Sequence, residues 1–489
     1  MTEFMFTLTI ITLVLAVYYL IYHVGTVWIV MIAAVQIARE TRWPHKFEEI
    51  ETFSNPLAPL VSVIVPAHNE EAGIAAAVDS LRHLRYPALE ILVVDDGSTD
   101  RTFDVLANRY GLRQRRPSHP DERVPQLGES LSEFETADGT LRVIQKRSIG
   151  RRADAVNTAL RVAKGELVCM IDADSMLAPD SLLRLVVPFM DDPSIVASGG
   201  TVLPANGISF HGGNPTMSRL PKGWLERFQL VEYLRAFVLG RTGWARRNGL
   251  TIISGAFGLY RRESVLRVGG LTGASLAEDA DLLLAVHSDC VERGVEYRVV
   301  FDARAICWTE VPSELGQLRT QRIRWAQGLD EILSKYRRMM YNPRYRVLGM
   351  LAMPWLLAYE YIAPFLAVFG FLISVTGLVT GWVSPGAVLL LAITGVGLAT
   401  IVGIFAIIVQ MLWMRRCQTK WGEAGLARLC ASSRGFSQPS AAESKRNKIL
   451  MKFCFVWFNV EACPSETAHQ ILPRFNNAFW SVIRSVSLS

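Results

Sequence analysis

The chain has 489 residues, half of them hydrophobic and a fifth charged, with a mean hydropathy of +0.24. The length allows about three soluble domains, but the positive hydropathy predicts that part of the chain lies in lipid. The net charge of +6 is small and no basic stripe is apparent, which argues against a nucleic-acid partner. The seven cysteines are scattered without a Cys-x-x-Cys pair, so they indicate neither a zinc site nor a disulfide framework.

The apolar residues are concentrated towards the two ends of the chain. Residues 4–35 contain no Lys, Arg, Asp or Glu, and this run is too long for a signal peptide, so it predicts a membrane-spanning helix within residues 1–38. Two downstream runs predict further spans, and two shorter ones predict a third span or an interfacial helix. These runs are about 357–382, 387–414, 449–460 and 471–483.

Basic residues flank the expected spans and orient them. They are Arg39 and Arg42, Arg337 and Arg338, and Arg415 and Arg416. By the positive-inside rule these residues lie in the cytoplasm and the N-terminus lies outside. The sequence therefore predicts an integral plasma-membrane protein with a cytoplasmic domain at 39–345. Membrane and interfacial helices follow at 346–489, with a cytosolic loop at 415–447.

The expected cytoplasmic domain alternates apolar strands with helices. Strands are predicted at 60–67, 90–96, 141–146 and 166–172, and helices at 70–84, from 100 onwards, at 152–163, from 278 onwards and at 313–336. Apolar runs separated by helices are typical of a mostly parallel α/β sheet. The polar stretch 112–140 holds three prolines and is predicted to be an exposed excursion.

Acidic residues follow three of the predicted strands. Glu70 follows the first strand, Asp95 and Asp96 end the second, and Asp172 and Asp174 follow the fourth. Helix capping explains any one of these acids. Ligands bind at the carboxyl ends of strands, however, and three acidic strand ends on one edge are unfavourable without a cation or a ligand rich in hydrogen-bond donors. Because Mg²⁺ takes carboxylate and phosphate oxygens, the pattern predicts a site for a metal and a diphosphate.

Five short motifs occur in a characteristic order: VSVIVPAHNEE, VVDDGSTD, DAD, AED and QRIRW. Together they resemble the processive, membrane-embedded glycosyltransferases of family 2, which include hyaluronan, cellulose, chitin-oligosaccharide and poly-N-acetylglucosamine synthases. The resemblance covers about residues 55–340. It implies an α/β GT-A fold flanked by transmembrane helices, a UDP-sugar donor, and Mg²⁺ or Mn²⁺ as cofactor.

The resemblance also implies which residues bind the donor. They are Pro66, His68, Asn69, Glu70, Asp95, Asp96, Arg152, Asp172, Gln321 and Arg322. Asp174 is expected to hold the metal ion together with Asp172. Arg152 stands where many relatives have Lys, and an Arg holds phosphate or sugar oxygens differently. A solvated arginine in the first turn of a helix is the simple structural alternative for this position.

Glu278 and Asp279 begin a helical run, where capping is the simple structural alternative. In relatives the residue matching Asp279 removes the proton from the acceptor hydroxyl, and here Ala277 replaces the usual Thr before the pair. Helical spacing places Gln321, Arg324 and Trp325 on one face. The resemblance implies that Arg324 neutralises the leaving UDP and that Trp325 forms a platform for a sugar ring.

The sequence thus predicts a metal-dependent inverting hexosyltransferase with Asp279, Glu278 and Arg324 as catalytic residues. Its acceptor loop is expected at Ser254, Gly255, Ala256 and Phe257. The expected reaction elongates a β-linked polysaccharide from UDP-N-acetylglucosamine or UDP-glucose and extrudes it across the membrane. Two alternatives stay open: a non-processive enzyme that adds one or few sugars to a lipid, and a non-catalytic scaffold of an envelope complex. The expected partners are the UDP-sugar, a growing glycan or lipid-linked acceptor, and membrane lipid.

Overall fold

A computed structural model describes residues 2–42, 57–211, 214–218 and 221–418. These residues belong to one compact unit, and residues 432–489 form a second unit that lies outside the described part. The apolar stretches predicted at 449–460 and 471–483 therefore lie outside the described residues, as does almost all of the predicted loop 415–447.

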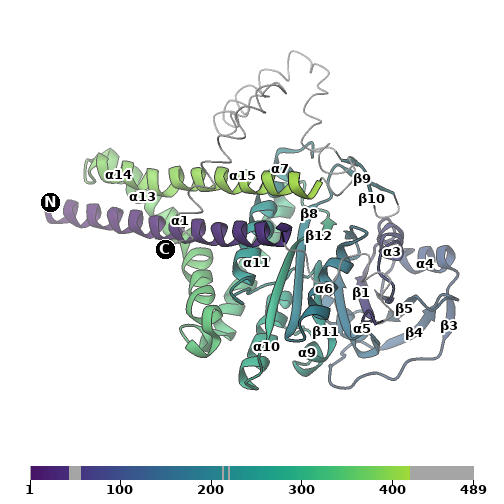
Figure 1. Cartoon of the computed structure of the whole chain (residues 1–489). Coiled ribbons are helices and arrows are strands. Elements are labelled where there is room, and N and C mark those ends of the chain that lie inside the picture. The colour runs from purple at the N-terminus through teal and green to yellow at the C-terminus, as the bar shows by residue number, and fades with distance from the viewer. Residues whose placement is uncertain (1, 43–56, 212–213, 219–220, 419–489) are drawn as a thin grey trace, which may run out of the picture. The chain divides into compact units, whose positions relative to one another are not determined.

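The centre of the described unit is a ten-stranded sheet with the order β3-β4-β5-β2-β1-β6-β11-β8-β12-β7 (Figure 1). Its strands are β1 Val61–Ala67, β2 Leu89–Asp96, β3 Arg113–Arg115, β4 Ser130–Glu135, β5 Leu141–Lys146, β6 Leu167–Ile171, β7 Met176–Leu177, β8 Ile195–Pro204, β11 Phe257–Arg261 and β12 Arg298–Thr309. A separate two-stranded sheet contains β9 (Ile208–His211) and β10 (Asn214–Ser218).

The α-helices are α1 Thr2–Arg42, α3 Ile74–Arg82, α4 Thr102–Tyr110, α5 Arg152–Val162, α6 Ser181–Asp191, α7 Trp224–Leu234, α8 Thr242–Ala245, α9 Arg262–Arg267, α10 Glu278–Glu292, α11 Leu315–Lys335, α12 Met353–Trp355, α13 Ala363–Thr380, α14 Pro385–Ala392 and α15 Leu398–Gln418. Stretches of π-helix join several of them: η1 Arg235–Arg241, η4 Leu348–Ala352, η5 Leu356–Ile362 and η6 Ile393–Gly397.

The four predicted strands are confirmed as β1, β2, β5 and β6, and they pair in parallel. The residues of β1, β2 and β6 are buried on both faces of the sheet, which is why these strands read as largely apolar runs, whereas β5 also buries Arg142 and Lys146. The antiparallel strand β11 follows β6 in the sheet, and β8 and β12 come next. The predicted α/β class is therefore confirmed, but the sheet is mixed: β5, β2, β1 and β6 are parallel neighbours, as are β8 and β12, whereas the remaining neighbours pair antiparallel.

The polar stretch 112–140 is more ordered than the prediction of an exposed excursion. It contains β3 and β4, which extend the sheet antiparallel to β5. Glu133 of β4 is buried and pairs with buried Arg142 of β5 at 3.1 Å. Strand β4 thus buries a charged pair where an apolar pattern would ordinarily mark a strand.

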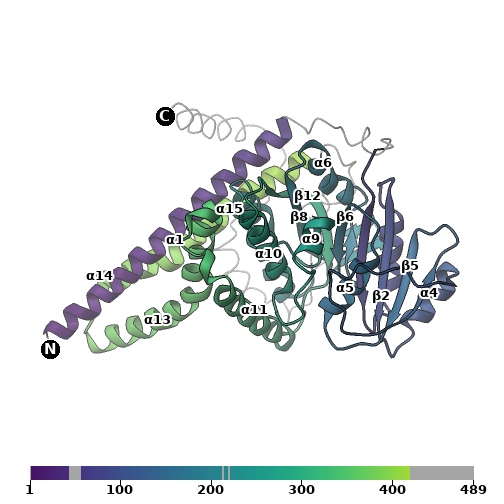
Figure 2. The same ribbon diagram turned by 90° about the horizontal axis from the view of Figure 1, so that it is seen from below.

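Three helical segments are long and apolar enough to cross a membrane: Met5–Gln36, Leu348–Thr380 and Pro385–Ala406. They match the three predicted spans, with the second beginning nine residues earlier than the predicted 357. Figures 1 and 2 show α1 running beside α15. The Tyr18 hydroxyl of α1 donates a hydrogen bond to the Ala358 carbonyl in the second segment.

Helices α10 and α11 lie between the sheet and the apolar helices (Figure 2). They share one apolar cluster with the start of the second apolar segment, formed by Ala280, Leu284, Ile332, Leu333, Tyr336, Met339, Leu348, Ala352 and Met353. The Lys335 ammonium and the Tyr336 hydroxyl of this end of α11 both bind the buried carboxylate of Asp281, at 2.6 and 2.9 Å. Helices α10 and α11 are therefore fixed against each other.

Candidate active site

The carboxyl ends of β1, β2 and β5 lie level, because Ala67 pairs with Asp95 and Asp96 pairs with Lys146. The turn after β1 closes against the turn after β2. Asn69 has a positive φ of 57°, and its side-chain oxygen accepts a hydrogen bond from the Thr99 N–H at 2.8 Å. The two motifs thus form one joined pair of loops at this edge of the sheet.

Other predicted donor residues belong to the same loops. The His68 ring contacts the Asp96 carbonyl through Nδ1 at 2.8 Å, and Pro66 is the sixth residue of β1. Asp95 accepts a hydrogen bond from the Ser98 N–H at 3.0 Å. His68, Asn69 and Glu70 remain partly or fully exposed, so their side chains are available to a ligand.

Asp96 differs from the expectation that its carboxylate contacts the donor. Its side chain is buried, and Lys146 donates to Oδ1 at 2.7 Å while Ser148 donates to Oδ2 at 3.1 Å. Lys146 is itself fully buried and pairs with Asp154 at 2.7 Å. Both oxygens of Asp96 thus have partners within the protein, and we assign the residue to holding the loop in place.

Arg152 connects the residue that follows β6, the helix α10 and the loop before β11. Its guanidinium binds the Asp172 carboxylate at 2.7 and 2.9 Å, the Glu278 carboxylate at 2.6 Å and the Gly255 carbonyl at 2.9 Å. Burial alone would lower the pKa of Arg152, but Asp172 and Glu278 raise it above its usual value. This charge-assisted network excludes the alternative of a solvated first-turn arginine.

Glu278 and Asp279 occupy the first turn of α10, as predicted. Asp279 accepts a hydrogen bond from the Gly255 N–H at 3.1 Å, so the loop before β11 contacts both Arg152 and Asp279. Burial raises the pKa of Glu278 while Arg152 opposes the shift. The Asp-x-Asp, the Glu-Asp pair and the loop that begins at Ser254 therefore form one site.

The Asp172–Asp174 pair fits a hard divalent cation. Burial raises the pKa of Asp174, and the negative charges of Asp172 and Glu310 add to this shift. Partial burial raises the pKa of Glu70, and the negative charges of Asp174, Asp100 and Asp172 add to this shift. The described residues contain no group of three His, Cys, Asp or Glu that would hold a metal alone. The donor set suits a cation that completes its shell with phosphate and water oxygens.

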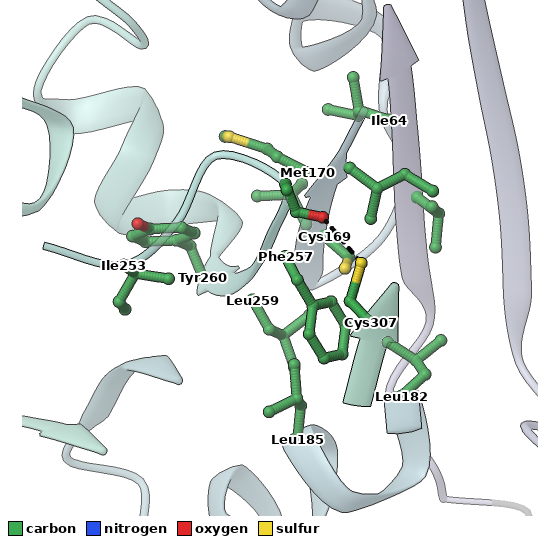
Figure 3. Close-up of a cluster of buried hydrophobic side chains, with 14 of the residues drawn as sticks. Ile64, Cys169, Met170, Leu182, Leu185, Ile253, Phe257, Leu259, Tyr260 and Cys307 are labelled. Carbon is green, nitrogen blue, oxygen red and sulfur yellow. Dashed lines mark hydrogen bonds between the residues drawn. The ribbon is translucent and has the colours of Figure 1, made fainter. Parts of the chain in front are cut away.

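The loop predicted to hold the acceptor is only partly available for this role. Ser254 and Gly255 are partly exposed, whereas Ala256 is buried and Phe257 is completely buried in the core (Figure 3). The Phe257 ring fills the space where a side chain at Gly200 would lie, with ring atoms 2.3 and 2.5 Å from that position. The prediction that Phe257 contacts an acceptor is therefore wrong, because this side chain is buried in the hydrophobic core.

Helix α11 carries the QRIRW motif on its exposed part. Arg322 forms two hydrogen bonds with Glu232 of α7, at 2.7 and 2.6 Å, and its guanidinium lies 4.5 Å from the centroid of the Trp325 ring. Arg324 and Trp325 are exposed, and no hydrogen bond or ion pair between described residues joins Arg324 to the carboxylates. The roles of Gln321, Arg322, Arg324 and Trp325 stay predictions.

Two family models match the chain. Glycosyl transferase family 2 matches residues 62–116, and Glycosyl transferase family group 2 matches residues 167–409. Together they cover more than half of the chain, including the strand ends and the α10–α11 pair. The chain belongs to glycosyltransferase family 2.

Curated relatives of this glycosyltransferase include poly-β-1,6-N-acetyl-D-glucosamine synthases. The synthase of Staphylococcus epidermidis is 25% identical over 56% of this chain and 55% of its own length, and that of Staphylococcus aureus strain COL is 26% identical over the same shares. The chain thus spans about half the length of these relatives. The mannosyltransferase PcManGT from Pyrobaculum calidifontis covers 85% of this chain and 99% of its own at 22% identity, with a TM-score of 0.54. The fold is GT-A.

The sequence patterns missed two charged residues of this glycosyltransferase site. Glu310 follows β12 and faces Asp174, but it lies outside every motif. Arg241 ends the π-helix η1, and burial lowers its pKa to about 10 although the charge of Asp279 opposes this. Its Nη1 is buried without a hydrogen-bond partner among the described residues. A lone Arg or Glu outside a motif gives no sequence signal, because only the fold brings it to the site.

Proposed function

We propose that the chain transfers sugars from a UDP-sugar to a growing β-linked glycan and inverts the anomeric carbon. The observation that carries this proposal is the Arg152 network. It joins an acid of the Asp-x-Asp, an acid of the Glu-Asp pair and the loop before β11 through contacts of 2.6–2.9 Å. Such a junction supports an in-line displacement, which requires a proton acceptor close to the diphosphate.

In this reaction Asp279 accepts the proton of the acceptor hydroxyl. The hydroxyl oxygen forms a bond to the anomeric carbon while the bond from that carbon to the diphosphate oxygen breaks, and UDP leaves with the electron pair. The Gly255 N–H orients Asp279 through its 3.1 Å hydrogen bond. Arg152 holds Glu278 and Asp172 at fixed positions, and Arg324 supplies positive charge for the leaving diphosphate.

Asp174, with Asp172, would hold Mg²⁺ or Mn²⁺. A divalent cation at this position neutralises charge on a diphosphate leaving group. PcManGT, which shares the fold, is described in complex with GDP-mannose and Mn²⁺. This supports a nucleotide-sugar donor and a divalent ion here.

The names of the curated relatives support a polymer as product and N-acetylglucosamine as the first donor to test, with UDP-glucose second. The three apolar helices support a membrane enzyme that extrudes its product. In the proposed orientation the GT-A domain is cytoplasmic and the N-terminus lies outside.

The decisive experiment incubates the purified full chain with single UDP-sugars and either Mg²⁺ or Mn²⁺, followed by sizing and digestion of the product. Asp279→Asn should abolish transfer, because it removes the proton acceptor. Asp104→Asn is the matched control, since Asp104 is exposed in the first turn of α4 and should leave the rate unchanged.

A polymer that forms with one UDP-sugar would support the proposal. A product limited to a lipid with one or two sugars would replace it with the non-processive alternative. Full activity of Asp279→Asn would refute the assignment of the base, and absence of any transfer with every donor would favour the scaffold alternative.

A further inference from the structure

A cleft of about 580 Å³ lies at the end of α5 opposite to Arg152. One wall is the segment 115–121 after β3, another is residues 161–164 at the end of α5, and Arg262 completes it. The residues 161–164 immediately precede β6, whereas Asp172 follows that strand. The cleft is therefore at the amino end of β6, separate from the carboxylate site, and its volume lies within the range of small-molecule sites.

The lining of this cleft is strongly cationic. Its five Arg and Lys side chains are Arg115, Arg116, Arg161, Lys164 and Arg262, and His119 lies among them. The only carboxylate in the lining is Asp121, which pairs with Arg123 at 2.8 Å and with Arg262 at 3.6 Å. Arg115 pairs with Glu135 at 3.0 Å, just outside the lining. The remaining three cations, Arg116, Arg161 and Lys164, form no ion pair between described residues. We conclude that the cleft carries excess positive charge that its own walls do not neutralise.

Two of these arginines present donors that lack an acceptor. The Nε atoms of Arg161 and Arg262 are buried, and neither has a hydrogen-bond partner among the described residues. A buried donor without a partner is unfavourable, so neither guanidinium has all of its hydrogen-bonding capacity satisfied within the protein. Arg116 and Lys164 are exposed at the same cleft and form no ion pair between described residues.

The elements that line the cleft also reach the carboxylate site. Helix α5 carries Arg152 at its first position and Arg161 near its last, about 14 Å apart along the helix axis. Strand β11 begins just after Gly255 and leads directly into Arg262. A ligand in the cleft would therefore contact the far ends of two elements that position Arg152 and Asp279.

We infer that this cleft binds a small soluble molecule with two or more phosphate groups. Arginine forks bind phosphate oxygens in pairs, and several guanidinium groups within one cleft favour clustered phosphates over a single carboxylate. This site is additional to the proposed glycosyl transfer and does not depend on it.

The test is calorimetric titration of the detergent-solubilised full chain with inorganic pyrophosphate at 0.15 M salt, without divalent cations. The double variant Arg161→Gln/Lys164→Gln should weaken binding at least tenfold. The matched control is Arg337→Gln/Arg338→Gln, which removes the same charge from an exposed turn after α11 and should change binding less than twofold. Thermal unfolding of each variant verifies that it is folded.

A third variant, Arg116→Gln, changes an exposed loop position and should weaken binding by a smaller factor. Equal losses in both double variants would reduce the effect to general charge attraction and overturn the inference, as would the absence of saturable binding below 1 mM. Tighter binding of monomeric dihexanoylphosphatidylglycerol than of pyrophosphate, with the same dependence on Arg161, would identify a lipid headgroup as the ligand and also overturn it.

Discussion

Replacing Arg152 by lysine should impair transfer strongly without unfolding the protein. The guanidinium binds Asp172, Glu278 and the Gly255 carbonyl at the same time. A lysine ammonium is a single point and reaches one of these three partners well. The variant therefore loses two charge-assisted contacts, each with a typical value of about 1.5–3 kcal/mol.

Arg152 keeps 29% of its side-chain surface exposed, so solvent reduces the loss to the lower end of this range. We expect the variant to lose about 3 kcal/mol of transition-state stabilisation in total, which corresponds to about a 100-fold lower kcat/KM for the donor. The assay measures UDP release from UDP-N-acetylglucosamine, with thermal unfolding as a check on the fold. Arg151→Lys is the matched control, because Arg151 is exposed and should tolerate the change.

Wild-type kcat/KM in Arg152→Lys would refute the reasoning, because it would show that the fork geometry is not needed. An equal loss in Arg151→Lys would refute it as well, since the effect would then come from the segment rather than from the network. A variant that is merely unfolded is recognised by its unfolding temperature.

Three further predictions concern stability. Burial lowers the pKa of His287 to about 4, below the 6.5 of the unfolded chain, so the free energy of unfolding is complete above pH 6.5 and falls by about 3 kcal/mol towards pH 4. In His287→Gln the midpoint of thermal unfolding should depend less on pH over this interval. An unchanged pH dependence would contradict the assignment. Gly328→Ala should destabilise by about 1–3 kcal/mol in thermal unfolding, because the new Cβ would lie 2.8 Å from the Cβ of Ala277; a variant as stable as wild type would show that α11 can shift freely. Lys146→Met leaves two buried carboxylates without their ion-pair partner and should lower the free energy of unfolding by about 3–5 kcal/mol. Lys164 is exposed, and Lys164→Met should change the free energy of unfolding by no more than about 0.5 kcal/mol. Equal unfolding temperatures for these two variants would exclude a structural role for the buried ion pairs.

Strands β1 and β6 could be predicted from sequence because they are apolar on both faces of the sheet. Residues 61–67 and 167–171 are almost entirely buried, and each is followed by polar residues that form the site. Strand β4 escaped prediction because its buried position 133 is a glutamate. Its partner Arg142 lies on another strand, so the compensation is visible only after folding.

The part of the sheet beyond β6 was harder to predict for packing reasons. Strand β8 contains Gly199 and Gly200, which weaken a strand pattern. The structure shows why they are there: a Cβ at Gly200 would clash with the Phe257 ring. Strand β12 has a register shift between Asp302 and Ile306, and an irregularity of this kind breaks the alternation that a strand prediction depends on.

The candidate site was predicted where a motif ends a strand or begins a helix. Arg152 joins Asp172 to Glu278 through ion pairs that the motifs alone could not show. Asp96 and Phe257 were misassigned because a motif does not reveal whether a side chain faces a ligand or the interior. Burial is a property of the folded chain and not of the local sequence.

The apolar cluster that joins α10, α11 and Leu348 has a mechanical consequence. It contains Ala280, next to Asp279, and it also contains Met353 in the second apolar segment. Close packing transmits displacement instead of absorbing it. A tilt of that segment would therefore move the first turn of α10 as well. The apolar helices and the carboxylates of α10 would then keep the same relative position during each round of catalysis.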